Sequence, residues 1–568
     1  MHRRPQCAWI LFAISLGLAA PAAGGDWPTY LHDAARSGVT AETLALPLAL
    51  DWVFVPPAPP APGWGDAEQG AIWKVGIPFQ QAVCYDDAYH VAAVGDCVCF
   101  AASAECKVYC LDARRAAIRW TASTGAPARC GPTVRGGKVY VGADDGRVYC
   151  FHAADGTPAW QLDAAPHGDR VIGQGYMMSL WPVRTGVVLA GPNACFAAGL
   201  YANYGLSLHA VRASDGRPAW TSADFGRGDE ATAQGYLLAD DRRIVVPAGR
   251  TFPLVFDRSS GKLQGRITAG RNGPNGGSYA VLSGNLLVNG AGSLTAYDLD
   301  APPGGSQGPA AFAPPLWSWL RSQAVVADAE NIYMVTDTDV FAIARGEVAR
   351  ACGPATGFET NRRPDWSRCL WRKTAQRVPD ALILAGGRLV AGGAGKVVAY
   401  DAATGDVLWS AKVEGRARGL AVANGRLLVS TTTGRIYSFA GTGAGRRIAP
   451  PAPAEPFPGD RLGEFYRRTA EAIVRTAPTG VAVHGDCPNF RRENGTVPLG
   501  PGFGLVIGGA APGRPGQLAC ELARRTSLRI QLVEPDQPSA AAARTALCTA
   551  GFYGTRVQVE HGSLTALG

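Results

Sequence analysis

The chain has 568 residues, of which 72 are glycine and 41 are proline, and 47% of all residues are hydrophobic. This composition excludes a disordered chain, and the glycine and proline content excludes a coiled coil or a bundle of long helices. The net charge of +8 comes from 54 basic and 46 acidic residues without a basic run, so no nucleic-acid partner is expected. All 14 tryptophans lie between Trp9 and Trp409, which predicts two differently built parts.

Residues 1–24 are expected to be a secretory signal peptide. Residues 2–4 are His-Arg-Arg, residues 7–18 are apolar, and residues 20–22 (Ala-Pro-Ala) offer a small-residue cleavage site. The apolar run is shorter than the roughly 20 residues of a membrane span, which favours cleavage over an uncleaved anchor. We therefore expect an exported protein, periplasmic or extracellular, with no membrane span once the signal is removed.

Several cysteines lie close together in the sequence. Cys97 and Cys99 are two residues apart and so face the same side of any strand, with Cys84, Cys106 and Cys110 nearby. In an exported protein some of them can form a disulfide, but the sequence does not determine which ones pair. Zinc binding is the alternative, although the spacing is not that of a standard zinc knuckle, and no metal site is predicted.

A repeated hairpin pattern runs through the middle of the chain. Each copy has a short strand, a turn with glycine near its end, and a second short strand, because glycine supplies the positive φ that such turns need. The clearest copies are residues 137–149, 284–295, 387–398 and 425–437. With weaker copies near Phe341 and Phe439, about eight units lie between residues 80 and 440, each about 40 to 60 residues long.

A second pattern places a tryptophan eight residues after a polar residue, with a turn between them. The pairs are Asp112 and Trp120, His152 and Trp160, Arg212 and Trp220, and Asp401 and Trp409. Asp257 and Asp298 continue the series without a tryptophan at that distance. Short strands with this period are typical of four-stranded propeller blades, which bury their faces against each other.

We expect each tryptophan to lie in the seam between two blades, with its N–H on a backbone carbonyl. Residues 48–54 resemble an isolated outer strand that carries Trp52, and we predict that they pair into the last blade and close the ring. Eight blades are predicted, with seven as the alternative. Cys110 and Cys150 occupy the position of alanine in other copies, so we expect them to be small buried residues.

These repeats resemble the quinoprotein-type, or PQQ-like, β-propeller repeat. Residues 26–30 and 34–38 also resemble the entry segment of such proteins, and we assign residues 26–446 to the propeller. Quinone-dependent dehydrogenases of this fold add an adjacent Cys-Cys pair and a calcium site, whereas this chain has no Cys-Cys dipeptide and no conspicuous acidic cluster. Other members are scaffolds, such as an outer-membrane assembly lipoprotein, so the resemblance favours a binding or scaffold module over a PQQ-dependent enzyme.

Two intervals between repeats are longer than a blade connection requires. They contain residues 173–186 and 361–366. Long loops on a propeller collect on its faces, where ligands bind. We therefore predict a ligand groove on one face for a protein, a glycan or a polyanion, with ordinary packing between blades as the alternative. The candidate lining residues are Trp181, Arg184, Arg362, Arg363 and Trp366.

The end of the chain has a different pattern. Residues 447–458 are a proline-rich linker, and Asp460 can cap the helix that follows. Apolar strands then alternate with helices, which predicts a parallel sheet. The expected strands are residues 504–508, 528–533 and 556–560, and the expected helices are residues 517–525 and 538–550.

This order resembles the first half of a class I S-adenosylmethionine-dependent methyltransferase, a Rossmann-like α/β domain. In that family a glycine-rich turn approaches the cofactor and an acid at the end of strand two holds its ribose. The resemblance assigns these roles to Gly508, Gly509, Gly513, Gly516 and Glu534.

The chain departs from the methyltransferase pattern. Pro512 and Pro515 interrupt the glycine turn, Gly562-Ser563 stands where the family has Gly-Asp, and strands four to seven are absent. We therefore expect residues 459–568 to be a partial domain with an exposed apolar face and no catalytic residues. The alternative is a fragment of a methyltransferase fused to a propeller.

Overall fold

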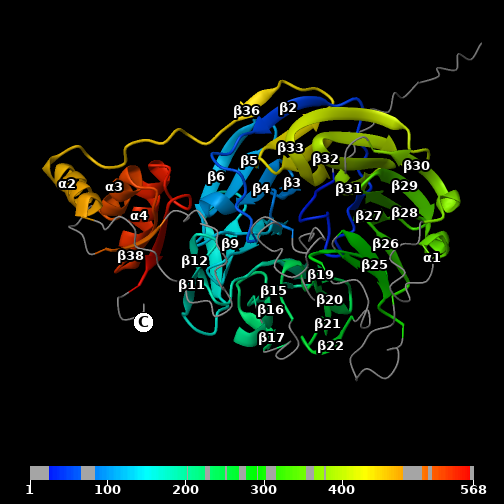
Figure 1. The fold of residues 1–568 in the computed structure, drawn as a ribbon, viewed down its shortest axis with the longest axis horizontal. Helices are drawn as coiled ribbons and strands as arrows, with labels where there is room; N and C mark the ends of the chain where they lie inside the picture. Colours follow the sequence, from blue (N-terminus) through cyan, green and yellow to red (C-terminus); the bar gives the residue numbers. More distant parts are fainter. Residues whose placement is uncertain are drawn as a thin grey trace, which may run out of the picture.

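The computed structural model describes residues 25–64, 84–200, 202–223, 225, 231–249, 253–267, 277–290, 292–301, 315–352, 364–375, 379–476, 502–508 and 514–562. The predicted signal peptide lies outside these residues. The described chain builds a large β-rich body, and a smaller body of helices and strands lies beside it (Figure 1). The large body is a β-propeller.

Six sheets of the propeller each contain four antiparallel strands in chain order. The first sheet contains β3 (Val91–Val94), β4 (Cys97–Ala102), β5 (Lys107–Asp112) and β6 (Ala117–Ser123). The second contains β7 (Thr133–Arg135), β8 (Lys138–Gly142), β9 (Arg147–His152) and β10 (Pro158–Asp163). The third contains β14 (Val188–Ala190), β15 (Asn193–Ala198), β16 (Ser207–Arg212) and β17 (Pro218–Ser222). The fourth sheet contains β19 (Leu238–Ala239), β20 (Arg243–Val246), β21 (Leu254–Asp257) and β22 (Leu263–Arg266). The fifth contains β23 (Tyr279–Ser283), β24 (Leu286–Gly290), β25 (Ser293–Asp298) and β26 (Trp317–Leu320). The sixth contains β27 (Ser322–Ala327), β28 (Asn331–Thr336), β29 (Asp339–Ala344) and β30 (Cys369–Thr374).

A seventh, eight-stranded sheet joins the beginning and the end of the propeller. Its order is β1 (Val39–Thr40), β31 (Pro379–Ala385), β32 (Arg388–Asp401), β33 (Val407–Ala423), β34 (Arg426–Thr431), β35 (Ile436–Ala440), β2 (Ala49–Phe54) and β36 (Arg446–Ile448). β2 pairs antiparallel with β35, which confirms that residues 48–54 join the last strands of the repeat region. In Figure 1 the blue β2 lies beside the yellow β36.

The tryptophans of the repeat lie in the seams between sheets, as predicted. The indole N–H of five of them donates to a backbone carbonyl of a neighbouring unit, at 2.8–3.1 Å, whereas the buried indole N–H of Trp220 has no hydrogen-bond partner among the described residues. The donor and acceptor pairs are Trp52 and Ala113, Trp120 and Ala153, Trp160 and Ala213, Trp371 and Ala402, and Trp409 and Leu48. Each bond links two neighbouring units, so the seam tryptophans hold adjacent sheets together.

Each fourth-strand tryptophan faces a small residue on the strand before it. The small residues are Cys110, Cys150, Ala210, Ala296, Ala342 and Ala399. Cys110 and Cys150 are fully buried there, as expected for small core residues. Trp317 and Trp371 take part in this register although the sequence pattern missed both, because inserted residues before β26 and β30 destroy the eight-residue spacing.

The turn glycine of one unit packs under the tryptophan of the preceding unit. Gly156 has φ +75°, and a Cβ at this position would lie 2.5 Å from Cε3 of Trp120. Gly156→Ala should therefore lower the free energy of unfolding by about 1–2 kcal/mol for left-handed backbone strain, and by about 1 kcal/mol or more for the clash. Denaturant unfolding measures this loss.

Gly136→Ala is the matched control for Gly156→Ala. Gly136 also has a left-handed backbone, with φ +59°, but a Cβ there would meet no atom within 4 Å. The control should show only the backbone strain. If the two variants lose equal stability, the contact between glycine and tryptophan contributes nothing to the seam.

The N-terminal segment, residues 25–40, ties five sheets together. Its backbone forms hydrogen bonds with the first strand of each of these sheets, at 2.7–2.9 Å. The bonded pairs are Trp27 with Ala93, Pro28 with Val134, Ala34 with Ala239, Ala35 with Leu282, and Gly38 with Leu384. All five bonds go to first strands, so the segment runs along the first-strand edges of five sheets, which surround the axis of the propeller.

The smaller body is a three-stranded parallel sheet with helices between its strands. Its elements are α2 (Arg461–Thr476), β37 (Phe503–Ile507), α3 (Gln517–Arg525), β38 (Arg529–Glu534), α4 (Gln537–Thr549) and β39 (Val557–His561). The elements agree with the predicted ones to within about one residue at each end. Among the described strands β37 lies at an edge of this sheet, and its Leu505 and Ile507 are exposed.

The smaller body rests on a hairpin of the propeller, β11 (Arg170–Gly173) and β12 (Tyr176–Ser179). Gln558 exchanges two hydrogen bonds, of 2.7 and 3.1 Å, with the backbone of Met177. The guanidinium of Arg529 lies 4.3 Å from the ring centroid of Tyr176. The buried hydroxyl of Tyr553 donates to the carbonyl of Thr124 at 2.6 Å. Part of the long interval that was predicted to form a face loop thus carries the smaller body.

Candidate functional site

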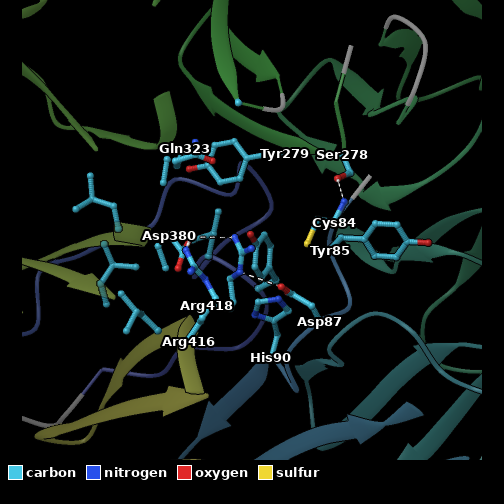
Figure 2. Close-up of a pocket in the computed structure, with 18 of the residues that line it drawn as sticks. Cys84, Tyr85, Asp87, His90, Ser278, Tyr279, Gln323, Asp380, Arg416 and Arg418 are labelled. Atoms are coloured by element: carbon cyan, nitrogen blue, oxygen red, sulfur yellow. Dashed lines mark hydrogen bonds and ion pairs between the residues drawn. The ribbon is translucent and has the colours of Figure 1, made fainter. Parts of the chain in front are cut away.

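A cavity of about 410 Å³ lies where the N-terminal segment meets the first strands of several sheets. We call it the axial cavity. Figure 2 shows its polar side chains converging from separate parts of the chain. Its polar and aromatic lining residues are Tyr30, Cys84, Tyr85, Asp87, His90, Ser278, Tyr279, Gln323, Asp337, Asp380, Arg416 and Arg418.

Two arginines and two aspartates form an ion-paired wall of the axial cavity. Asp380 Oδ1 lies 2.7 Å from Nη2 of Arg416 and 3.4 Å from Nη1 of Arg418. The Nε of Arg418 lies 2.9 Å from Oδ2 of Asp87. The wall therefore carries no net charge when all four groups are ionised. Asp337, at the same cavity, pairs with Arg321 outside it.

The second carboxylate oxygen of Asp380 is available for a ligand. The Asp380 side chain is only 4% exposed, and its Oδ2 has no hydrogen-bond partner among the described residues. A buried acceptor without a partner is costly, so such atoms are commonly satisfied by a bound molecule or water. The side chains of Arg416 and Arg418 remain 41% and 27% exposed. The wall thus offers one acceptor beside two donors.

The floor of the axial cavity is aromatic and uncharged. The ring of Tyr30 stacks on Tyr236 with centroids 3.8 Å apart, and His90 meets Tyr30 edge-on at 4.7 Å. Burial lowers the pKa of His90 to about 4, so the imidazole is neutral at pH 7. Burial also raises the pKa of Tyr30, which stays protonated. Flat uncharged rings of this kind can pack against the face of a ligand.

Arg184 belongs to a buried ion cluster of Asp86, Arg129, Asp144 and Arg184. Asp144 lies 2.8 Å from Arg129 and 2.9 Å from Arg184, and all three side chains are buried. Burial would raise the pKa of Asp144, but the two guanidinium groups hold it below its usual range. Burial raises the pKa of Asp86 to about 6, although Arg129 opposes the change. The cluster thus consists of charges that satisfy each other inside the propeller.

The residues of the predicted face groove are not brought together. Trp181 is buried, with its N–H on the carbonyl of Tyr204 at 2.6 Å, and Arg184 is only 2% exposed. Trp366 packs against Trp319, and the guanidinium of Arg372 lies 3.8 Å above its ring. Trp181 and Arg184 are therefore core residues of the propeller rather than surface residues. Arg362 and Arg363 lie outside the described residues, so their part of the groove stays a prediction.

Three of the residues assigned to S-adenosylmethionine do meet at the ends of β37 and β38. The carboxylate of Glu534 accepts the N–H of Gly516 at 3.1 Å and lies against Gly508. Glu534 is buried, and burial raises its pKa. Its carboxylate is used within the fold, so the described residues do not fit a cofactor ribose. Gly509 and Gly513 lie outside the described residues.

The axial cavity also does not fit an acidic quinone. Arg416 and Arg418 are each paired with a carboxylate, so the wall presents no surplus positive charge.

In the parts of the chain that the structure describes, no three His, Cys, Asp or Glu side chains are grouped to hold a metal ion. Over the same residues, no helix combines the length and the apolar character needed to cross a membrane.

The sequence pattern did not identify the axial cavity. Its residues come from at least six segments between Tyr30 and Arg418, and each is unremarkable in its own segment. The one local signal was the pair Arg416 and Arg418 at the start of the apolar stretch 419–423. Two charged residues beside a buried strand indicate a polar partner, but not its position.

A protein-family model described as outer membrane protein assembly factor BamB matches residues 66–221 and 344–447. No curated protein matches the chain. Among solved structures, BamB from Moraxella catarrhalis is 16% identical, with a TM-score of 0.43 and coverage of 62% of this chain and 94% of that one.

Two quinohemoprotein alcohol dehydrogenases are also similar. The protein from Comamonas testosteroni is 14% identical, with a TM-score of 0.48 and coverage of 78% and 84%. ADHIIG from Pseudomonas putida HK5 is 13% identical, with a TM-score of 0.49 and coverage of 79% and 85%. The family match and the sheet pattern together support a PQQ-like propeller.

Proposed function

We propose that the chain is an exported binding or scaffold module, an eight-bladed PQQ-like propeller whose axial cavity holds a neutral, polyhydroxylated group such as a sugar unit of a glycan. The proposal rests on the buried Oδ2 of Asp380, which has no partner among the described residues and lies beside two partly exposed arginine side chains. The smaller body, residues 459–568, has no catalytic role in this proposal.

The pairing within the eight-stranded sheet supports eight blades. Residues 388–393 of β32 pair with β31, whereas residues 394–400 pair with β33. Residues 417–423 of β33 then pair with β34. The sheet therefore contains the strands for two more four-stranded blades, the second of which is completed by β2.

The balance of charge favours a neutral ligand. The two arginines face two aspartates, so an anion or a cation would have to displace an existing ion pair. A sugar hydroxyl both donates and accepts, so it can bond to Asp380 Oδ2 and to a guanidinium at once. The side chains of Gln323 and Tyr279 lie opposite this wall in Figure 2. The cavity volume is within the range of small-ligand sites.

The test is binding of methyl glycosides of glucose, galactose, mannose and N-acetylglucosamine, followed by saturation-transfer NMR and calorimetry. At least one glycoside should bind, and Asp380→Asn should weaken its binding about 10-fold or more, because a hydrogen bond to a charged group is worth about 1.5–3 kcal/mol. Asp401→Asn is the control, since Asp401 pairs with Arg388 away from the axial cavity. Tighter binding of glucuronate than of every neutral glycoside would contradict the proposal.

Two measurements separate this proposal from an enzyme. Oxidation of an alcohol or a sugar by the protein, supplied with pyrroloquinoline quinone and calcium, would show a quinone-dependent dehydrogenase instead. Heat of binding in a calorimetric titration with S-adenosylmethionine would support the methyltransferase-like interpretation of residues 459–568. We expect neither, because the axial arginines and Glu534 are already engaged within the fold.

A further inference from the structure

A second cavity, of about 470 Å³, lies in the seam between the sixth sheet and the eight-stranded sheet. We call it the seam pocket. The end of β30 lines one side, and β32 with the turn before β33 lines the other. In Figure 1 these strands lie on the side of the propeller away from the smaller body. The seam pocket shares no lining residue with the axial cavity, and its volume is within the range of small-ligand sites.

The seam pocket is lined by three basic side chains, two of which are already paired. Arg372 donates two hydrogen bonds of 2.9 Å to the carboxylate of Asp339. The Nζ of Lys373 lies 3.0 Å from Oδ1 of Asp406. The third, Lys396, is exposed, and its ammonium group has no ion pair or hydrogen bond among the described residues. One positive charge at the seam pocket is therefore free to meet a ligand.

The strand register adds a second unpaired lysine beside Lys396. Lys412 on β33 stands directly opposite Lys396 on β32, so both side chains lie on the same face of the sheet. Lys412 is also exposed, and within the described parts of the chain its ammonium group has no partner. Like charges directly opposite each other destabilise a strand pair, and a bound anion would relieve this repulsion. The seam pocket thus has surplus positive charge, whereas the wall of the axial cavity is balanced.

Tyr400 supplies a hydroxyl and an apolar wall. Its side chain lines the seam pocket, the residue is only 7% exposed, and its hydroxyl makes no hydrogen bond with any residue that the structure describes. Burial raises the pKa of Tyr400, so the hydroxyl stays protonated and can donate. Ala391 and Val398 line the pocket on the same strand. A buried hydroxyl without a protein partner is costly, so it is expected to bond to a bound molecule.

We propose that the seam pocket binds a small organic acid. The carboxylate meets the ammonium group of Lys396 and the hydroxyl of Tyr400, and the apolar body of the acid packs against Val398 and the ring of Tyr400. A neutral ligand would leave Lys396 without a counter-charge, and a bare ion would leave the apolar wall in contact with water. A carboxylate with an apolar body satisfies both. This inference is independent of the ligand proposed for the axial cavity.

The test is a calorimetric titration of the full chain with benzoate, with its neutral isostere benzamide and with acetate. Benzoate should bind about 10-fold more tightly than benzamide, because benzamide loses the charge-assisted hydrogen bonds. It should also bind about 10-fold more tightly than acetate, because acetate has no ring to bury. Added salt should weaken the binding of benzoate, since Lys396 and Lys412 are exposed. Absence of benzoate binding, or equal binding of benzamide or acetate, would overturn the proposal.

Two variants locate the bound benzoate. Lys396→Gln and Tyr400→Phe should each weaken its binding about 5- to 10-fold. Both should fold, because Lys396 is exposed and phenylalanine keeps the buried ring, and circular dichroism checks this. The matched controls are Lys262→Gln, an exposed lysine of another sheet, and Tyr297→Phe, at the corresponding position of β25. The controls should bind benzoate as the wild type does, and unchanged binding in either of the two seam-pocket variants would overturn the proposal.

Discussion

Trp52→Ala should lower the free energy of unfolding by about 3–5 kcal/mol, as expected for removal of a fully buried tryptophan. Trp52 has no exposed surface, and its N–H donates to the carbonyl of Ala113 at 2.8 Å. The strand that carries it, β2, joins the last strands of the propeller to a neighbouring sheet. Loss of the indole ring therefore leaves a cavity and an unpaired backbone carbonyl, and it weakens the contact that joins the first and last parts of the propeller.

Denaturant unfolding followed by tryptophan fluorescence and circular dichroism measures this effect. Trp409→Ala is the matched control, because Trp409 makes the same kind of seam bond, to the carbonyl of Leu48 at 2.9 Å, but is only partly buried. The control should lose about 1–2 kcal/mol less than Trp52→Ala, since less apolar area leaves water. Equal losses would show that β2 does not determine closure of the ring.

The repeat was predictable because its signals are local. A turn glycine, a polar residue and a tryptophan fall within eight residues of each other in the regular copies, and each such glycine packs under the tryptophan of the preceding unit. Trp317 and Trp371 occupy the same register, but insertions in their own units hide them from a search at constant spacing. The regular copies were therefore enough to predict the fold from the sequence. The irregular copies could be recognised only from the strand register of the structure.

The candidate site was not predictable for the opposite reason. Asp380, Arg416 and Asp87 converge only because the ring brings distant strands to its axis. Arg184 illustrates the error that follows when a partner is far away in the sequence. An arginine in a long interval indicates a surface residue, but Asp144, in the turn after β8, pairs with it inside the propeller. Aspartate is common in turns, so Asp144 gave no sign of a buried role.

Asp144→Asn should cost about 3–5 kcal/mol of stability at pH 7, because it leaves Arg129 and Arg184 buried without their carboxylate. Asparagine keeps the shape of the side chain, so the loss reports charge and not volume. Denaturant unfolding at pH 7 measures it. Asp339→Asn is the matched control, since Asp339 is also buried but its partner Arg372 is 40% exposed and can be hydrated. The control should lose about 1–2 kcal/mol.

The pH dependence separates the charge of Asp144 from its packing. The folded pKa of Asp144 lies below its usual range, because its two arginine partners outweigh burial. A lowered carboxyl pKa stabilises the protein above the unfolded pKa, which is about 3.9, and this stability is lost as the pH falls toward the folded pKa. The gap between wild type and Asp144→Asn should therefore be largest at neutral pH and should narrow below about pH 4. A gap that stays constant from pH 7 to pH 3 would mean that asparagine disrupts packing, and that the buried ion cluster does not depend on the charge of Asp144.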